Sequence, residues 1–254
     1  MNTKRSILVL AMSLSVLSLI AQTKVIAHRG FWDTPGSAQN SIAALIKADS
    51  IGCYGSEFDV WLSKDNVLIV NHDPRFKGKR METSTAQELT ALKLSNGENM
   101  PTLEQYFQTA QTLPNKTKLI LELKEHNKKQ RETEAVKRIV EMVKKYGLED
   151  RIEYISFSLH ATKEFIRQSP DTPVYYLNGE LSPKELKAIG CAGFDYPLRP
   201  IKKNPEWIKQ AHDMGMQVNA WTINKESQMK WLIDNGVDFI TTNNPLLLQQ
   251  LLSR

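Results

Sequence analysis

Cysteine is scarce in this chain of 254 residues, which contains only Cys53 and Cys191. One possible pair is far from the dense disulfide framework that supports small secreted folds. The fold therefore needs a hydrophobic core, and a chain of this length buries one without covalent links. Each cysteine follows a glycine at the start of an apolar run. We expect two buried free thiols rather than a disulfide.

A strong charge of one sign is also missing, because 33 basic residues stand against 28 acidic ones, a formal net charge of +5. Without Lys4 and Arg5, which precede the expected mature domain, the balance is 31 to 28, or +3. This excess is too mild to indicate a nucleic-acid partner. The one dense basic run, Lys124 to Arg131, is interpreted as a solvated loop that leads into a helix.

The N-terminal apolar run, Ile7 to Ile20, is shorter than the roughly 20 residues that a membrane span needs. Lys4 and Arg5 precede it and the small Ala21 ends it, which is typical of a secretory signal. We therefore expect a signal peptide over residues 1–21 and a mature domain over 22–254. The mature chain would be periplasmic or secreted, without stable membrane insertion. No cysteine near this segment offers a site for lipid attachment.

From Lys24 onward, short apolar runs alternate with amphipathic stretches. The apolar runs predict strands at Val25–His28, Ser56–Trp61, Val67–Asn71, Leu119–Leu123, Ile152–Phe157, Val174–Leu177, Phe194–Pro197, Val218–Trp221 and Phe239–Thr241. The amphipathic stretches predict helices at Ser41–Ser50, Glu132–Tyr146, Thr162–Gln168, Pro183–Ile189, Pro205–Met214 and Lys225–Asn235.

Repeated strand–helix units indicate an α/β fold with a parallel sheet. About eight units in this length favour a TIM (β/α)8 barrel. The first strand is followed by no glycine-rich dinucleotide loop, which argues against an open doubly wound sheet. Between the second and third runs, the connection near Lys64 to Asn66 is too short for a parallel crossover. We expect a tight hairpin in place of that helix, hence an irregular barrel, with residues 73–101 forming a small excursion.

Charged and polar side chains gather where the predicted strands end, which is where barrel proteins place their active sites. These segments are His28-Arg29, Glu57-Phe58-Asp59, His72-Asp73, Glu122-Leu123-Lys124 and Trp221-Thr222-Ile223-Asn224. Side chains two residues apart on a strand share one face, so three carboxylates should point into the barrel mouth. Burying like charges is costly without a cation. All-oxygen ligation suits one divalent ion, Mg²⁺ or Ca²⁺.

The series of motifs resembles the glycerophosphodiester phosphodiesterase family, over a span from about Val25 to Pro245. The matching segments are His28-Arg29-Gly30, Glu57-x-Asp59, His72-Asp73-Pro74, Pro101-Thr102-Leu103-Glu104, Glu122-x-Lys124 and Trp221-Thr222-x-Asn224. Members of that family are irregular TIM barrels that bind one divalent metal. The resemblance implies an enzyme that converts a small glycerophosphodiester into sn-glycerol 3-phosphate and an alcohol.

The resemblance also implies a role for each matching residue. Glu57, Asp59 and Glu122 would be the metal ligands, and His28 and His72 would be the general acid and base. Arg29 and Lys124 would bind the phosphate, and Trp221 would form an aromatic wall of the pocket. General chemistry agrees, because a phosphodiester needs positive charge around its oxygens, and two imidazoles exchange protons near neutral pH. Which histidine is the base stays open.

Two positions depart from the family pattern. Gln39 stands where a glutamate is usual, and we expect it to orient Arg29 without adding charge. Asn243 stands where an aspartate is usual. We expect it to support Arg29 or the barrel floor and leave it outside the site.

Three other hypotheses remain. The first is a phospholipase C-like or D-like enzyme that acts on lipid phosphodiesters. The second is a catalytically degenerate barrel that acts as a binding protein. The third is a zinc hydrolase with His28 and His72 as metal ligands. The other histidines, His126, His160 and His212, are expected at the surface or in caps. The sequence leaves open the alcohol, the native metal and the oligomeric state.

Overall fold

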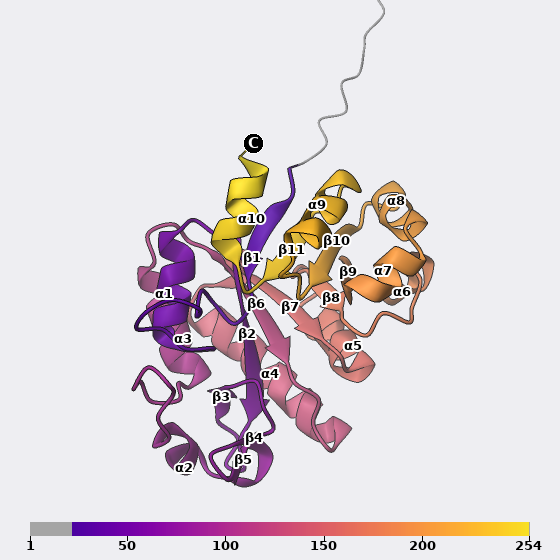
Figure 1. The fold of residues 1–254 in the computed structure, drawn as a ribbon. Coiled ribbons are helices and arrows are strands. Elements are labelled where there is room, and N and C mark those ends of the chain that lie inside the picture. Colours follow the sequence, from indigo (N-terminus) through magenta and orange to yellow (C-terminus); the bar gives the residue numbers. More distant parts are fainter. Residues whose placement is uncertain (1–21, 254) are drawn as a thin grey trace, which may run out of the picture.

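The computed structural model describes residues 22–253 (Figure 1). The predicted signal peptide, residues 1–21, lies outside the described residues, so export stays a prediction. Within residues 22–253, every helix is too short or too polar to cross a bilayer.

Eight parallel strands close into a barrel, as predicted. Strand β1 pairs with β11 on one side and with β2 on the other, and this second pairing completes the ring. In chain order the ring strands are β1 (Lys24–Ala27), β2 (Gly55–Leu62), β6 (Lys118–Leu123), β7 (Ile152–Ser156), β8 (Val174–Tyr176), β9 (Gly193–Pro197), β10 (Gln217–Trp221) and β11 (Phe239–Thr242).

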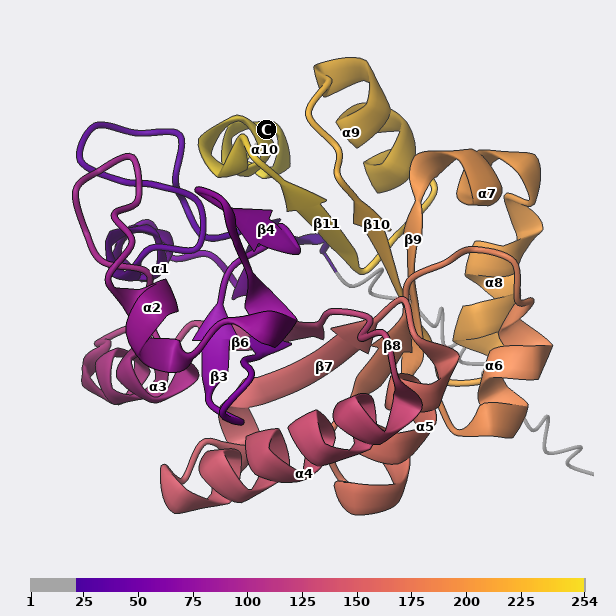
Figure 2. The ribbon, with the colours of Figure 1, turned by 90° about the horizontal axis from the view of Figure 1, so that it is seen from below.

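Helices lie around the outside of this ring (Figure 2). The larger ones are α1 (Ile42–Ser50), α3 (Leu103–Thr112), α4 (Lys129–Lys145), α5 (Leu159–Gln168), α6 (Pro183–Ile189), α8 (Glu206–Asp213), α9 (Glu226–Asp234) and α10 (Pro245–Leu252). The smaller α7 (Leu198–Lys203) follows β9 directly, and the short turn η2 (Glu149–Arg151) precedes β7.

Hydroxyl side chains define where several of these helices begin. Ser41 accepts a hydrogen bond from the backbone of Ala44 at the start of α1. Ser182 and Thr102 form complete capping boxes at the starts of α6 and α3. Such caps satisfy backbone N–H groups that have no partner inside the helix. They fix the entry of the chain into each helix, and therefore the position of the loop that precedes it.

The expected hairpin follows β2. Strand β3 (Leu68–Val70) returns antiparallel to β2, with Val60 opposite Val70, and lies outside the closed ring. Asn66 in the connection has a positive φ of 63°, a conformation that asparagine tolerates better than most residues. The next ring strand is β6, and α3 leads into it. The sequence pattern did not predict α3, α7 or α10.

The expected excursion, residues 73–101, forms a small apolar layer of its own. It contains the two-stranded β4 (Arg75–Phe76) and β5 (Lys79–Arg80), the turn η1 (Met81–Thr83) and α2 (Ala86–Thr90). Met81, Leu89 and Met100 pack there against Trp61 and Ile69. This packing joins the excursion to the hairpin and so places the segment after β3 near the barrel.

Alternation along the strands divides the barrel into an outer and an inner layer. Phe58 and Val60 of β2 face the helices in one large cluster. The inner layer instead contains Ile26, Ile155 and Tyr175. Because successive residues of a strand point to opposite faces, Glu57 and Asp59 turn inward with this inner layer. Both cysteines are free and buried, which confirms the expectation of thiols.

Candidate active site

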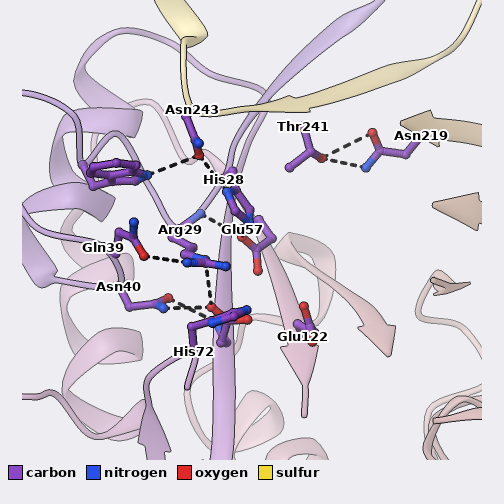
Figure 3. A network of polar contacts seen from close by, with 12 residues as sticks. His28, Arg29, Gln39, Asn40, Glu57, His72, Glu122, Asn219, Thr241 and Asn243 are labelled. Atoms are coloured by element: carbon purple, nitrogen blue, oxygen red, sulfur yellow. Dashed lines mark hydrogen bonds and ion pairs between the residues drawn. The ribbon is translucent and has the colours of Figure 1, made fainter. Parts of the chain in front are cut away.

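Three carboxylates meet inside the barrel, as the sequence predicts. Glu57 and Asp59 project from β2, and Glu122 of β6 lies opposite Asp59 in the strand register. They are 3%, 1% and 8% exposed. One oxygen from each lies within 4.8 Å of the others. Figure 3 shows Glu57 and Glu122 near the two histidines.

The electrostatics of this cluster suit the binding of a cation. Burial, followed by repulsion from Asp59 and Glu122, raises the pKa of Glu57 well above its usual value. Burial and the charge of Asp59 raise the pKa of Glu122 to about 7. Burial opposes the charged form of Asp59, but Lys124, His72 and Arg29 outweigh it and lower its pKa. Within residues 22–253, the buried Oε1 of Glu57 has no hydrogen-bond partner. Oxygen donors in this arrangement suit a hard divalent ion.

Two basic side chains reach the same carboxylates. The Nζ atom of Lys124 lies 2.7 Å from Glu122 Oε1 and 3.3 Å from Asp59 Oδ1. The Nε atom of Arg29 lies 3.6 Å from Asp59 Oδ2. A terminal guanidinium nitrogen of Arg29 donates to Gln39 Oε1 at 2.6 Å. Gln39 therefore orients Arg29, as expected.

The local sequence explains the sharp turn that carries Arg29. Arg29 has φ 57° and Gly30 has φ 76°, and the backbone N–H of Arg29 donates to Glu57 Oε2 at 2.7 Å. A Cβ at position 30 would lie 2.7 Å from the backbone carbon of Ala44 in α1. Glycine is thus required for the close approach of this turn to α1.

His28 follows β1 and is held by an amide. Its Nδ1 atom lies 2.7 Å from Asn243 Oδ1, and its Nε2 atom lies 3.9 Å from Glu57 Oε2. The indole N–H of Trp32 donates to the same Asn243 oxygen at 3.4 Å. Because an indole N–H can only donate, this contact supports the orientation of the Asn243 amide in which its oxygen faces Trp32 and His28. The prediction that Asn243 supports Arg29 or the barrel floor is wrong, because this residue, which directly follows β11, reaches His28 instead.

His72 approaches from the hairpin, two residues beyond β3. Its Nδ1 atom lies 2.7 Å from Asp73 Oδ1, and its side chain is 37% exposed. The indole N–H of Trp61 donates to the backbone carbonyl of His72 at 3.1 Å. In contrast, burial and the charge of Arg29 lower the pKa of His28 to about 4. The two imidazoles therefore have different partners and different exposure to water.

A cavity of about 240 Å³ joins these groups. Trp221 forms part of its wall, and its indole N–H donates to the backbone carbonyl of Asp195 at 2.9 Å. Phe157 packs edge-on against the Trp221 ring, with 5.4 Å between ring centroids. The wall contains six of the eight predicted residues, namely His28, Arg29, Glu57, His72, Glu122 and Trp221. The other two, Asp59 and Lys124, contact Arg29 and Glu122 directly.

Several residues near the site were not predicted. The amide nitrogen of Asn40 donates to Asp59 Oδ2 at 2.8 Å, and its oxygen accepts from the Asp59 backbone at 3.1 Å. Its positive φ of 61° turns the side chain toward the cluster. Asp195 and Thr241 also line the cavity. The available signal for Asp195 was a lone carboxylate between two aromatic residues of a strand.

The prediction for His126 is wrong, because this residue is buried and structural. Its Nε2 atom accepts from the Leu62 backbone at 3.0 Å, and its Nδ1 atom lies 2.8 Å from the Lys124 carbonyl. The imidazole thus joins the end of β2 to the segment after β6. It supports the position of Lys124 and does not enter the cavity wall.

Comparison with known proteins identifies the family. Residues 28–247 match the model of the glycerophosphoryl diester phosphodiesterase family. The chain belongs to this family. Because the match spans most of the domain, it confirms the resemblance that the motifs indicated, the barrel fold, and the expectation of an enzyme.

Relatives agree with this assignment. A glycerophosphodiester phosphodiesterase from Parabacteroides distasonis is 51% identical, with a TM-score of 0.90, over 92% of this chain and 98% of that one. A glycerophosphodiester phosphodiesterase from Caldanaerobacter subterraneus is 27% identical over 92% of this chain and 99% of its own length. An Oleispira antarctica phosphodiesterase, solved with its product sn-glycerol-3-phosphate, shares the fold at 24% identity and a TM-score of 0.78, over 92% and 98% of the two chains.

Proposed function

We propose that this member of the glycerophosphoryl diester phosphodiesterase family is a divalent-metal-dependent hydrolase. It cleaves glycerophosphodiesters to sn-glycerol 3-phosphate and an alcohol. The observation that carries the proposal is the convergence of three buried carboxylates, two cationic side chains and two histidines at one end of the barrel. The names of the related enzymes from Parabacteroides and Caldanaerobacter support the substrate class.

Binding of the phosphate falls to Arg29 and Lys124. An arginine grips two phosphate oxygens at once, whereas a lysine acts as a point charge. Both side chains lie within 4 Å of Asp59, so their charge is partly balanced before substrate arrives. A cation held by Glu57, Asp59 and Glu122 would neutralise these carboxylates, leaving the positive charge of Arg29 and Lys124 for the phosphate. When bound, it would polarise a substrate hydroxyl and a phosphate oxygen.

The two histidines divide the proton transfers. His28 shares its Nδ1 proton with the neutral amide of Asn243, which leaves Nε2 free to accept a proton and makes His28 the base. His72 shares its Nδ1 proton with the carboxylate of Asp73, which leaves its Nε2 atom to exchange a proton, and with His28 as the base the second proton transfer falls to His72. His72 is therefore the acid, which donates from Nε2.

The reaction then proceeds by an internal displacement. The glycerol 2-hydroxyl gives its proton to His28, and its oxygen forms a new bond to phosphorus. The bond from phosphorus to the leaving alcohol breaks, and His72 protonates that alcohol. Water opens the resulting cyclic phosphate by the reverse proton transfers. An analogue that lacks the 2-hydroxyl should not turn over, and its rapid cleavage would refute the internal route.

The size of the cavity favours a small substrate. A volume of about 240 Å³ corresponds to roughly eight water molecules, which suits a glycerol phosphate head group. Among the described residues, the group that could hold a metal ion consists of three carboxylates and contains no histidine. This composition favours Mg²⁺ or Ca²⁺ over zinc.

Release of sn-glycerol 3-phosphate from glycerophosphocholine tests the proposal. The mature protein is assayed with chelator and after addition of Mg²⁺, Ca²⁺ or Zn²⁺. Glu57→Gln removes one carboxylate from the cluster. Glu153→Gln is the matched control, because Glu153 is equally buried in the barrel but bonds Tyr54 instead. Chelator and Glu57→Gln should each abolish release, while the control retains it. Unchanged release in chelator would refute the metal-dependent mechanism.

A further inference from the structure

A fourth carboxylate faces the same cavity from the opposite side of the barrel. Asp195 is the middle residue of β9 and is 2% exposed. Its neighbours Phe194 and Tyr196 pack outward among the helices, so the alternation of the strand turns Asp195 inward. It lines the 240 Å³ cavity together with Glu122 and Trp221. None of the roles assigned above to the family motifs uses this residue.

The Oδ1 atom of Asp195 is buried and has no hydrogen-bond partner among the described residues. A buried polar atom without a partner is costly, and such atoms in native proteins usually meet a ligand or an ordered water. Asn219, its register partner on β10, hydrogen-bonds the Asp195 carboxyl group and also donates to Thr241 Oγ1 at 2.9 Å, so Oδ1 is the oxygen of Asp195 that has no partner within the described part of the chain. One oxygen of Asp195 therefore remains available to the cavity.

Burial and the charge of Glu122 raise the pKa of Asp195 well above its usual value. A carboxyl group accepts hydrogen bonds, and donates one when protonated, which matches the hydroxyl of a substrate. The surroundings suit the carbon chain of a polyol. Ile155, Leu177 and the ring of Trp221 form apolar walls beside Asp195, and the indole N–H of Trp221 is fixed on the Asp195 carbonyl.

We propose that Asp195 is a specificity-determining residue that hydrogen-bonds the terminal hydroxyl of the glycerol moiety. This inference rests on the proposed function, in which the 2-hydroxyl lies at the carboxylate cluster. The carbon chain then extends along Trp221 toward β9, and the terminal hydroxyl meets the free oxygen of Asp195. The enzyme thereby distinguishes glycerol from propanediol at the far end of the same molecule.

The test compares two substrates, sn-glycero-3-phosphocholine and its analogue with hydrogen in place of the terminal hydroxyl. Loss of one buried hydrogen bond predicts that the wild-type protein prefers the first by roughly 10- to 100-fold in kcat/KM. Asp195→Ala should reduce this ratio to near unity, mainly by slowing the natural substrate. Asp195→Asn should keep most of the preference, because an amide still donates and accepts. Glu153→Gln should keep the wild-type ratio.

The outcomes separate the two proposals. A wild-type protein that cleaves both substrates equally well overturns the role of Asp195, and so does an Asp195→Ala variant that slows both by the same factor. If Asp195→Ala does not fold, Asp195→Leu, whose side chain branches at the same carbon as aspartate, provides the same comparison. A wild-type protein that cleaves neither substrate overturns the proposed function itself.

Discussion

Removal of bound cations should make the stability of the wild-type protein depend on pH through Glu122. The perturbation is chelation, which leaves three carboxylates to repel one another in the barrel. Burial and Asp59 raise the pKa of Glu122 from 4.5 to about 7. Between these values the folded state holds a proton that the unfolded state has lost, so stability falls as the pH rises. At about 1.4 kcal/mol per pH unit, the titration of Glu122 lowers the free energy of unfolding by about 3 kcal/mol between pH 4.5 and pH 7.

Other groups also titrate in this window. The pKa of His28 is lowered to about 4, so protonation of the unfolded chain makes stability rise with pH up to about 6.5. The total curve therefore mixes opposing slopes. The lowered pKa of Asp59 acts only in more acidic solution. The difference in unfolding free energy between the wild type and Glu122→Gln removes the contributions that both proteins share.

The assay is urea unfolding of both proteins in chelator, from pH 4.5 to 8. Relative to Glu122→Gln, the wild type should lose about 3 kcal/mol of stability between pH 4.5 and 7. Saturating Mg²⁺ or Ca²⁺ should restore the wild type by RT ln(1 + [M]/Kd), about 2.7 kcal/mol at a hundredfold excess over Kd. The variant should respond less. A difference that stays constant across the pH range in chelator would refute the reasoning.

Three further predictions follow from particular contacts. Burial raises the pKa values of Cys53 and Cys191 to about 12, so thiol reagents at pH 8 should label both only after unfolding; labelling of the folded protein would contradict this. A Cβ at Gly193 would lie 1.9 Å from a carbonyl oxygen of β10. Gly193→Ala should therefore lower the free energy of unfolding, measured in urea, by about 3 kcal/mol. An unchanged urea midpoint would exclude the clash. Asn243→Asp places an anion on Nδ1 of His28, so the acidic limb of kcat/KM should move to higher pH; a shift to lower pH would count against the contact.

The fold was largely predictable because its signals are local. Strand β2 is buried along its whole length. In its sequence, apolar residues alternate with the carboxylates Glu57 and Asp59, and this pattern indicates a strand with one apolar face and one polar face. The hairpin followed from chain length alone, since few residues separate β2 and β3. Helix α3 was missed because its capping box at Thr102 coincides with the Pro101-Thr102-Leu103-Glu104 motif.

The site was predictable only where residues project from the ends of the strands. Glu57, Asp59 and Glu122 share the inner face by alternation, so their meeting needs no knowledge of distant packing. The partner of His28 was not predictable, because Asn243 follows it by 215 positions and reaches it only through the β1–β11 pairing. The same holds for His126, whose burial depends on the end of β2. Long-range contacts of this kind carry no local pattern.

The two departures from the family pattern have one electrostatic consequence. Gln39 and Asn243 are neutral, and each accepts a hydrogen bond from a functional side chain, Arg29 and His28 respectively. A carboxylate at either position would add negative charge beside three buried carboxylates, and it would stabilise the imidazolium form of His28. The amides keep the geometry without that charge. In the proposed mechanism, the charge of Arg29 is therefore not offset by Gln39, and His28 stays neutral and able to accept a proton.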